Sequence, residues 1–563
     1  MKRFLIFLFF NCLFLIGLLA VPAKPVVVVL TQPDGSELEV MLRGDELCHY
    51  YETFDGKIVV QNEYGWYEVV DDVLRVADNR ERAKVKRVNS LRRAPHQAER
   101  GLVILVEFTD KKFVKRREDF YNLLNKEGYN YNGATGSARD YFKSASNGQY
   151  VPEFDVYGPY QLDKIEGFYG RNDMSGNDVH PDQMVVDAVA KLAGDSTVDV
   201  NFADYDTDND GNIDNIFVYY AGYGENEGAP ASTIWPHAWE VYEQYVTGEL
   251  IYDGKTIRGY ACTSELQNTS DTIICGIGTF CHEFGHVLGL PDFYVTDYSS
   301  NHRTLGYWDI MDSGSYLNEG NTPPTYSAYE RFYLGWLIPE NLNASGDFYL
   351  EDLKKSNKAY IITPTREHNF DGAQPSPNVF YLLENRQKYG WDRYLPGHGM
   401  MISKVMFDEQ KWMNNIPNND KNTMGCDIIE AGGDSLVFGY GTESDLFPGS
   451  FGVAEFRPDL NSLISNIVES DSVITFTFKD DYNGVLVDVL NSNDRIVLVD
   501  CNGVCSLLGV EYGSEVCCYN SVGRLLWRKI VKEDVMTFNE PIGFYLLKIF
   551  DGDNVAVVKG LGY

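Results

Sequence analysis

Strand patterns account for most of the chain, and helical spacing is confined to a few segments. Residues 101–108 and 216–220 are almost wholly apolar, which predicts two buried strands. Residues 24–79 alternate apolar and polar positions, as expected for short strands joined by turns. Residues 137–146 and 279–288 instead repeat apolar residues at the spacing of a helix. The central part of the chain should therefore mix helices and strands.

The pattern divides the chain into five segments. A basic stretch at residues 80–100 stands out and indicates an exposed junction that is open to proteolysis. Strand patterns with Gly and Asn turns prevail after residue 340. The predicted fold class is α+β, with a mixed sheet and helices followed by β-sandwich-like domains at the C-terminus. The predicted segments are 1–23, 24–96, 97–340, 341–479 and 480–563.

Residues 1–23 have the pattern of a secretory signal peptide. A basic start, Met1-Lys2-Arg3, precedes an apolar run, and Val21-Pro22-Ala23 supplies small residues at a plausible cleavage point. The run, residues 4–19, is shorter than the roughly 20 residues that a membrane span needs. No later run is long and apolar enough to cross a bilayer. We therefore expect the remainder to be exported, either secreted or held at the cell surface.

Charge excludes some classes of partner. The 563 residues include 82 Asp and Glu against 48 Lys and Arg, a formal net charge of −34. A chain this acidic repels phosphate backbones and anionic membranes, so nucleic acid is not an expected partner. The hydrophobic content of 44% is ample for packed cores. The ten cysteines form no evident framework, and the sequence does not assign their pairing.

The strongest chemical signal is His282-Glu283-Phe284-Gly285-His286. Two His residues four positions apart on a helix share one face, so both imidazoles can reach one ion. Neutral imidazole nitrogen is a preferred ligand of Zn²⁺. Glu283, next to the first ligand, is positioned to take a proton from water that the metal acidifies.

The residues that follow supply a candidate third ligand. The text continues Val287-Leu288-Gly289-Leu290-Pro291-Asp292, so the whole reads HExxHxxGxxD. Gly289 can adopt the left-handed conformation that ends a helix, which lets the chain turn back and present Asp292. Asp297 and His302 are competing third ligands, and a more distant Glu319 or Glu330 is a further alternative.

This signature resembles that of the metzincin metallopeptidases, and more closely the immune-inhibitor-A-like metallopeptidases of peptidase family M6. The resemblance covers about residues 25–478 and implies a metzincin-like catalytic domain at 97–340, preceded by a pro-segment at 24–96. It implies a secreted zinc endopeptidase made as a zymogen and acting on protein or peptide substrates. Further matching text lies at Leu102–Asp110, Arg139–Phe142, Ile234–His237, Trp308–Ser315 and Leu383–Arg386.

Two residues after the zinc signature have expected roles. Metzincins have a methionine turn beneath the metal, and Met311 matches that element in a turn punctuated by Gly and Ser. The more common fate of a Met is simple core packing. Tyr316 follows shortly, and its hydroxyl could stabilise a tetrahedral oxyanion.

A second metal site is predicted in an acidic loop. Residues with oxygen-bearing side chains occupy every second position of this loop, and Gly211 occupies its sixth position. The first part of an EF-hand loop, which binds Ca²⁺, has the same pattern. The twelfth position is Phe217 rather than Glu, so the motif is not a full EF-hand. The alternative is a solvated acidic turn. The candidate calcium ligands are Asp206, Asp208, Asp210, Asn212 and Asp214.

Two further features concern latency and export. A thiolate from Cys48 in the pro-segment could cap the zinc, although a small buried residue is the simpler interpretation. Residues 480–563 resemble the sorting domain of the type IX secretion system, so export machinery is a predicted partner. The alternative is an ordinary β-sandwich appendage.

We therefore expect a zinc metalloendopeptidase that cleaves extracellular proteins with Glu283 as general base. Two alternatives come from other classes. One is a surface adhesin on a protease-derived scaffold, and the other is a zinc hydrolase of a non-peptide substrate.

Overall fold

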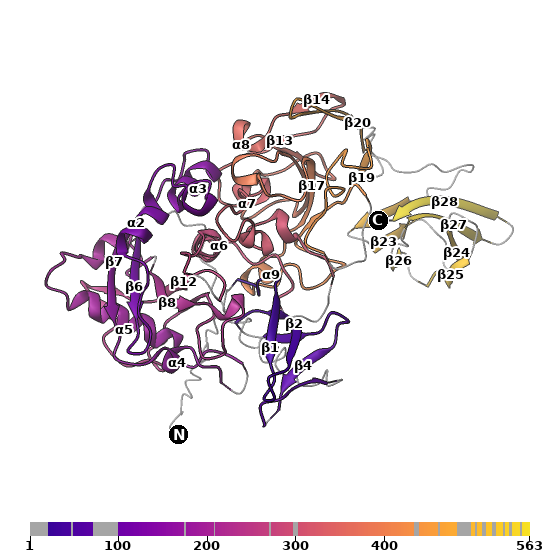
Figure 1. Ribbon diagram of the computed structural model, residues 1–563. Coiled ribbons are helices and arrows are strands. Elements are labelled where there is room, and N and C mark those ends of the chain that lie inside the picture. The colour runs from indigo at the N-terminus through magenta and orange to yellow at the C-terminus, as the bar shows by residue number, and fades with distance from the viewer. Residues whose placement is uncertain are drawn as a thin grey trace, which may run out of the picture. The chain divides into compact units, whose positions relative to one another are not determined.

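The structure is a computed structural model (Figure 1). It describes residues 21–480 except 47–48, 63, 71–99, 174–175, 208, 215, 270–271, 297–301, 433–438 and 460–461. Beyond residue 480 it describes 497–501, 504–508, 514–520, 525–532, 535–539, 543–551 and 554–562. The signal peptide up to residue 20, Cys48, Asp208, Asp297 and all of the basic stretch except Arg100 lie outside the described residues.

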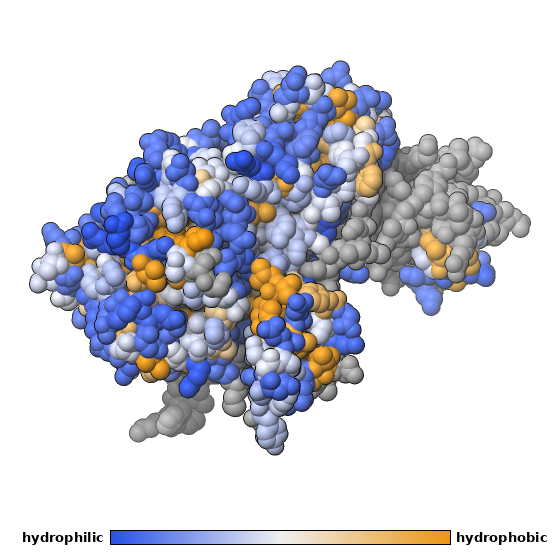
Figure 2. Space-filling view, in the orientation of Figure 1, coloured by the Kyte–Doolittle hydropathy of each residue, from blue (hydrophilic) through white to orange (hydrophobic). Residues whose placement is uncertain are grey.

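Residues 27–70 form the five-stranded antiparallel sheet that their alternation predicts. Leu30, Val40 and Val59 are buried in its core. Val27 and Val29 are half-exposed, and Figure 2 shows apolar side chains gathered over this sheet. The strands follow one another in order: β1 (Val27–Thr31), β2 (Glu37–Gly44), β3 (His49–Glu52), β4 (Ile58–Gln61) and β5 (Tyr67–Val70).

A second sheet of five strands lies within residues 100–266, in the order β7-β6-β8-β12-β9. The first four strands are parallel and β9 is antiparallel, so the sheet is mixed, as expected. The predicted buried strands at 101–108 and 216–220 are confirmed as β6 and β8. The bounds are β6 (Arg100–Glu107), β7 (Glu153–Gln161), β8 (Ile216–Tyr223), β9 (His237–Glu240) and β12 (Gly259–Leu266).

Helices cover both faces of this sheet, which explains the unbroken apolar runs of its central strands. Alternate residues of β6 belong to two different cores. Val103 and Leu105 pack with α2, α3 and α6, while Leu102, Ile104 and Val106 pack with α5. The helices are α2 (Arg117–Asn125), α3 (Ala138–Ala145), α4 (Glu166–Tyr169), α5 (Pro181–Ala193) and α6 (Gly278–Val287). A short hairpin is formed by β10 (Ile251–Tyr252) and β11 (Lys255–Thr256).

The α6 core continues into a third sheet, ordered β13-β15-β16-β17-β18. In β16, the fully buried Arg386 guanidinium pairs with Glu384 at 3.2 Å and with Asp392 at 2.8 Å. It also donates to the Thr325 carbonyl oxygen, just before α7. The bounds are α7 (Ala328–Tyr333), β13 (Glu340–Asn341), α8 (Leu353–Ser356), β15 (Tyr360–Ile362), β16 (Val379–Arg386), β17 (Gly399–Met406), α9 (Glu409–Met413) and β18 (Cys426–Ile428).

The chain separates into two compact units, and the smaller comprises residues 343–348, 455–466 and 476–563. One four-stranded sheet is ordered β14-β21-β20-β19: β14 (Gly346–Leu350), β19 (Phe456–Asp459), β20 (Ser462–Ser470) and β21 (Val473–Asp480). The described part of 480–563 contains only strands, in two sheets. The first is β22 (Val497–Cys501), β23 (Val504–Leu508) and β26 (Val535–Asn539), and the second is β25 (Leu525–Ile530), β24 (Glu515–Asn520), β27 (Gly543–Asp551) and β28 (Asn554–Gly562).

A mixed α/β architecture with several sheets and few helices therefore agrees with the predicted fold class, while the β-sandwich at the C-terminus remains a prediction. No helix among the described residues has the length and apolar character needed to cross a bilayer. The division into five segments also remains a prediction.

Candidate metal centre

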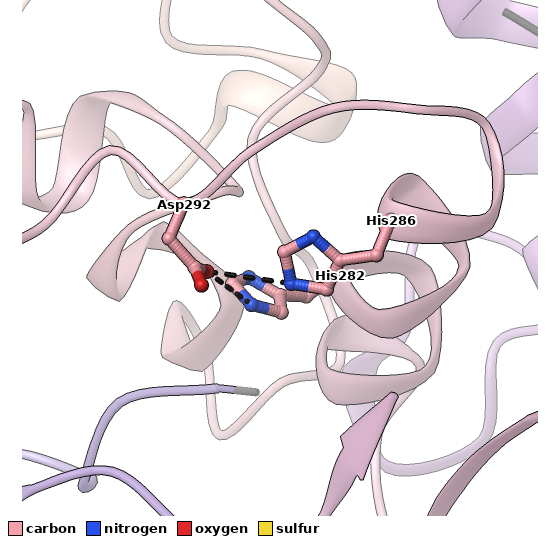
Figure 3. Close-up of side chains that lie close together, drawn as sticks. All are labelled: His282, His286 and Asp292. Carbon is pink, nitrogen blue, oxygen red and sulfur yellow. Dashed lines mark ion pairs between the residues drawn. The ribbon is translucent and has the colours of Figure 1, made fainter. Parts of the chain in front are cut away.

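The helix α6 brings His282 and His286 to one side of the sheet. Its first residue, Gly278, packs so closely on Ser315 that a Cβ atom would lie 1.8 Å from the Ser315 carbonyl oxygen. Phe280 and Phe284, also on α6, pack against Phe154 of β7. The two imidazole rings lie 4.9 Å apart, are perpendicular and are almost completely buried (Figure 3). The predicted helix at 279–288 is confirmed to within one residue at each end.

Backbone carbonyl groups fix the orientation of both rings. The Nδ1 atom of His282 lies 2.7 Å from the Ile310 carbonyl oxygen, and that of His286 lies 2.9 Å from the Leu290 carbonyl oxygen. A carbonyl can only accept, so each Nδ1 carries the proton and each Nε2 keeps a lone pair. Neither Nε2 atom has a hydrogen-bond partner, and both face Asp292.

Asp292 arrives through the turn that the sequence predicts. Gly289 has a φ of +99°, the left-handed conformation that ends the helix. The Oδ1 atom of Asp292 then lies 3.1 Å from His282 Nε2 and 3.4 Å from His286 Nε2.

Asn415 holds Asp292 from the other side. Its side-chain Nδ2 donates to Asp292 Oδ2 at 2.5 Å, and its side-chain Oδ1 accepts the Asp292 backbone N–H at 2.7 Å. Asn415 follows α9, is buried and has a φ of +53°. The paired contacts leave Oδ1 facing the imidazoles without a hydrogen bond.

The three residues fit a divalent metal ion. Their candidate ligand atoms, two imidazole nitrogens and one carboxylate oxygen, lie within 4.8 Å of one another. Three buried atoms with lone pairs, oriented by hydrogen bonds on their far sides, match the ligand set and outer contacts of zinc sites. The structure brings none of the described alternatives to this cluster. His302 contacts the Asn418 carbonyl oxygen, Glu319 binds Lys24, and Glu330 caps α7.

Glu283 lies beside the cluster and is fully buried. Burial raises the pKa of its carboxyl, and the negative charge of Asp292 raises it further. Its Oε1 atom accepts the backbone N–H of Val21 at 2.8 Å, while Oε2 has no hydrogen-bond partner.

Met311 lies directly against α6. A Cβ atom on Gly285 would come within 2.6 Å of the Met311 sulfur, so only glycine lets the two elements approach this closely. The preceding residue, Ile310, supplies the carbonyl that orients His282. The Met311 carbonyl oxygen accepts the backbone N–H of Phe293, next to Asp292. The role of Met311 as a methionine turn beneath a metal stays a prediction.

Tyr316 is buried near Glu283, and burial raises the pKa of its hydroxyl well above the ordinary value. The hydroxyl donates to the Pro22 carbonyl oxygen at 2.5 Å and accepts from Asn226 at 2.8 Å. It therefore contacts a peptide carbonyl as well as the buried Asn226 side chain.

The acidic loop contains a second group of candidate ligands. Carboxylate oxygens of Asp206, Asp210 and Asp214 lie within 4.8 Å of one another. A lysine already contacts this group, because Lys255 Nζ lies 2.5 Å from Asp206 Oδ2 and lowers the pKa of that carboxyl. Asn212 donates to Asp210 Oδ2 at 2.9 Å. Asp208 lies outside the described residues.

Sequence reasoning missed two contributors to the site. Asn415 lies 123 residues after Asp292, and no local pattern links the two. Residues 21–24 also reach the site, although the first three were assigned to the signal peptide. One motif of the family M6 resemblance, Ile234–His237, includes a residue that contacts this segment. The indole N–H of Trp235 donates to the Val21 carbonyl oxygen. No other feature of the sequence indicated these contacts.

Comparisons with known proteins bear on this geometry. Residues 88–338 match the family described as Immune inhibitor A peptidase M6, catalytic domain. The chain is 26% identical over 370 residues to the pre-pro-metalloprotease PrtV of Vibrio cholerae, covering 54% of this chain and 40% of that protein. It is 28% identical over 285 residues to Immune inhibitor A of Bacillus thuringiensis, covering 43% of this chain and 40% of that protein.

A solved structure described as PorZ, a component of the type IX secretion system of Porphyromonas gingivalis, matches 33% of this chain and 21% of that chain, with 11% identity. Its TM-score of 0.11 does not establish a shared fold. The matches to the two metalloproteases rest on sequence identities of 26% and 28%. The chain spans about two fifths of the length of each of these proteins. Together with the family match, these matches show that residues 88–338 of this chain are similar to the catalytic domain of the Immune inhibitor A peptidases of family M6.

Proposed function

We propose that this protein is an exported zinc endopeptidase made as a precursor. The observation that carries the proposal is the convergence of three buried lone-pair atoms, from His282, His286 and Asp292, within a domain of a peptidase family. These three side chains would hold the ion. A bound zinc ion supplies a Lewis acid, which polarises a carbonyl group and lowers the pKa of nearby water.

The protein's own residues would move the proton. Glu283 Oε2 has no hydrogen-bond partner, so it can accept a proton from the attacking water and later pass it to the leaving amine. The Tyr316 hydroxyl already donates to the Pro22 carbonyl oxygen, which supports a role in binding a peptide carbonyl of the substrate. A role for Tyr316 in stabilising the oxyanion stays a proposal that rests on the sequence. Met311 would support the histidines from below.

Latency would follow from residues 21–24. Val21 occupies one oxygen of Glu283 and Pro22 occupies the hydroxyl of Tyr316, so a substrate has no access to either group. This contact supports the zymogen assignment without any contribution from Cys48. It also requires that signal cleavage leave at least part of this segment attached.

We also retain the proposal of calcium in the loop of Asp206, Asp210 and Asp214, with Asn212 nearby. The clustered oxygens support it, and the contact with Lys255 offers another source of charge balance. Bound calcium would stabilise the fold rather than take part in catalysis. Export through a secretion machinery that recognises residues 480–563 remains a proposal that rests on sequence resemblance.

The proposal is tested with the processed protein purified after export. Casein digestion should require the bound metal: a chelator should abolish it and zinc should restore it. Binding to casein without cleavage would favour the adhesin. Hydrolysis of esters or other non-peptide substrates alone would favour the second alternative.

A further inference from the structure

Lys24 is buried against three polar side chains, those of Glu227, Asn268 and Glu319. The residue is only 3% exposed. Its Nζ atom donates to Glu319 Oε2 at 2.5 Å and to Asn268 Oδ1 at 2.7 Å, and lies 3.5 Å from Glu227 Oε1. An ammonium group removed from water needs such partners, because burial of an unpaired charge is costly.

The pocket belongs to the catalytic domain alone. Glu227 follows β8, Asn268 follows β12, and Glu319 follows the turn of Tyr316. Glu227 is held in place because it accepts the backbone N–H of Asn268. Asn268 and Glu319 both have a φ of +56°, so tight turns direct these residues. The pocket is therefore built from loops that remain when the pro-segment is removed.

The segment that ends at Lys24 lies along the catalytic residues as a peptide would. Its backbone contacts Glu283 at Val21 N, Tyr316 at Pro22 O, and the Asn226 carbonyl oxygen at Lys24 N, at 2.8 Å. A general base that protonates a leaving amine must lie beside its nitrogen. Val21 N therefore marks the position of that nitrogen, and Lys24 marks the fourth residue after the cleaved bond.

Charge balance indicates what the pocket binds once Lys24 leaves. Burial raises the pKa of the Glu227 carboxyl, and the Lys24 ammonium acts in the opposite direction. The buried Glu227 carboxylate and the half-exposed Glu319 carboxylate would then have lost the ammonium group that lies between them. A long basic side chain restores the pairing, whereas an apolar or acidic one does not.

We propose that Glu227, Glu319 and Asn268 form a substrate pocket that selects Lys or Arg at the fourth residue after the cleaved bond, and that Lys24 occupies it in the precursor. This inference rests on the proposed peptidase function. It adds a substrate class to the proposed zinc site: peptides with a basic residue at the fourth position after the cleaved bond.

The test uses processed, zinc-loaded protein and quenched fluorescent peptides that differ only at that fourth residue: Lys, Arg, norleucine or Glu. Norleucine keeps the length of the lysine chain without its charge. We expect kcat/KM to be about tenfold higher for Lys and Arg than for norleucine, because a charge-assisted hydrogen bond is lost. Glu319→Gln and Glu227→Gln should each reduce this ratio, and the double variant should bring it close to one.

Glu240→Gln is the matched control, since it removes a carboxylate that pairs with Arg258 at 3.1 Å elsewhere in the domain. It should keep the wild-type ratio. Equal cleavage of the lysine and norleucine peptides by wild type, or a preference that survives the double variant, would overturn the pocket but leave the peptidase intact.

A binding measurement covers the case in which no peptide is cleaved. Fluorescence anisotropy with labelled Val-Pro-Ala-Lys and Val-Pro-Ala-norleucine should show tighter binding of the lysine peptide to the wild-type protein than to Glu319→Gln. Absence of cleavage with this difference present would refute the peptidase and keep the pocket. Equal binding of the two peptides would refute the pocket.

Discussion

Two clusters in this chain bring three candidate ligand atoms within 4.8 Å, but their surroundings differ. In the cluster of His282, His286 and Asp292, every outer atom has a protein partner and every inner atom lacks a hydrogen bond. In the cluster of Asp206, Asp210 and Asp214, a lysine and an asparagine side chain contact the carboxylates directly.

The comparison shows why counting carboxylates is a poor guide to a metal site. An acidic group can be balanced by a neighbouring lysine, as Asp206 is by Lys255. A buried imidazole whose lone pair faces another acceptor has no donor within the protein to satisfy it. A cation between the two acceptors would satisfy both. The first cluster is therefore expected to bind its ion far more tightly than the second.

The largest effect should come from Glu283→Gln. Removal of the general base should lower kcat by about 10²–10⁴-fold, because proton transfer contributes on that scale. Zinc content should remain unchanged. Asp210→Asn in the acidic loop is the control and should leave kcat unaffected. Full activity of Glu283→Gln with zinc bound would remove the residue from the mechanism.

Asn415→Ala should weaken metal binding without touching a ligand. The change frees Asp292 from its two hydrogen bonds, and loss of such an outer contact typically costs about 10–100-fold in metal affinity. Zinc dissociation constants measured by competition with a chromophoric chelator give the result. The neighbouring Asn414→Ala should keep wild-type affinity, and equal constants for the two variants would contradict the role of Asn415.

Lys255→Met should expose the weaker cluster. Loss of the partly buried ion pair with Asp206 should lower the unfolding free energy by about 1 kcal/mol in the absence of calcium. Calcium should then raise Tm more in this variant than in wild type. The exposed pair of Lys191 with Asp163 provides a control, Lys191→Met. If calcium leaves Tm unchanged in wild type and in both variants, calcium binding by the loop is refuted.

The smallest effect concerns the proposed pro-segment, residues 24–96. His49 is stacked on Trp235 and lies 3.3 Å from Glu225. Burial opposes protonation, but Glu225 and the Asp45 carbonyl raise the pKa of His49 above its ordinary value. A raised pKa means that this contribution to stability is complete below about pH 6.5 and is lost as the pH rises through the folded-state value.

The pro-segment should therefore dissociate more readily at alkaline than at mildly acidic pH. Limited proteolysis of the precursor between pH 5 and pH 9 would measure this, and His49→Gln should flatten the profile. A profile that stays the same in His49→Gln would assign the pH dependence to other groups.

Local sequence predicted the local part of the site. The spacing of His282 and His286 predicted the helix, and Gly289 before Asp292 predicted the turn that follows it. Both features depend on residues only a few positions apart. Asn415 and Lys24 could not be found in this way. Their contacts join segments more than a hundred residues apart, and no periodicity records them.

In the acidic loop, the sequence indicated a site but not the lysine that contacts it. Its alternation of Asp residues indicated a calcium site with a solvated acidic turn as the alternative, but alternation says nothing about the charge that folding brings beside it. Lys255 comes from the hairpin strand β11, some 49 residues from Asp206, and partly satisfies the loop.

Metal analysis of the purified protein tests the central claim most directly. Wild type and Asp210→Ala should each contain about one zinc ion per chain, as expected for a single site of this ligand type. His286→Ala should contain none while remaining folded by circular dichroism. Zinc retained in His286→Ala, or absent from the folded wild-type protein after growth with zinc, would contradict the account.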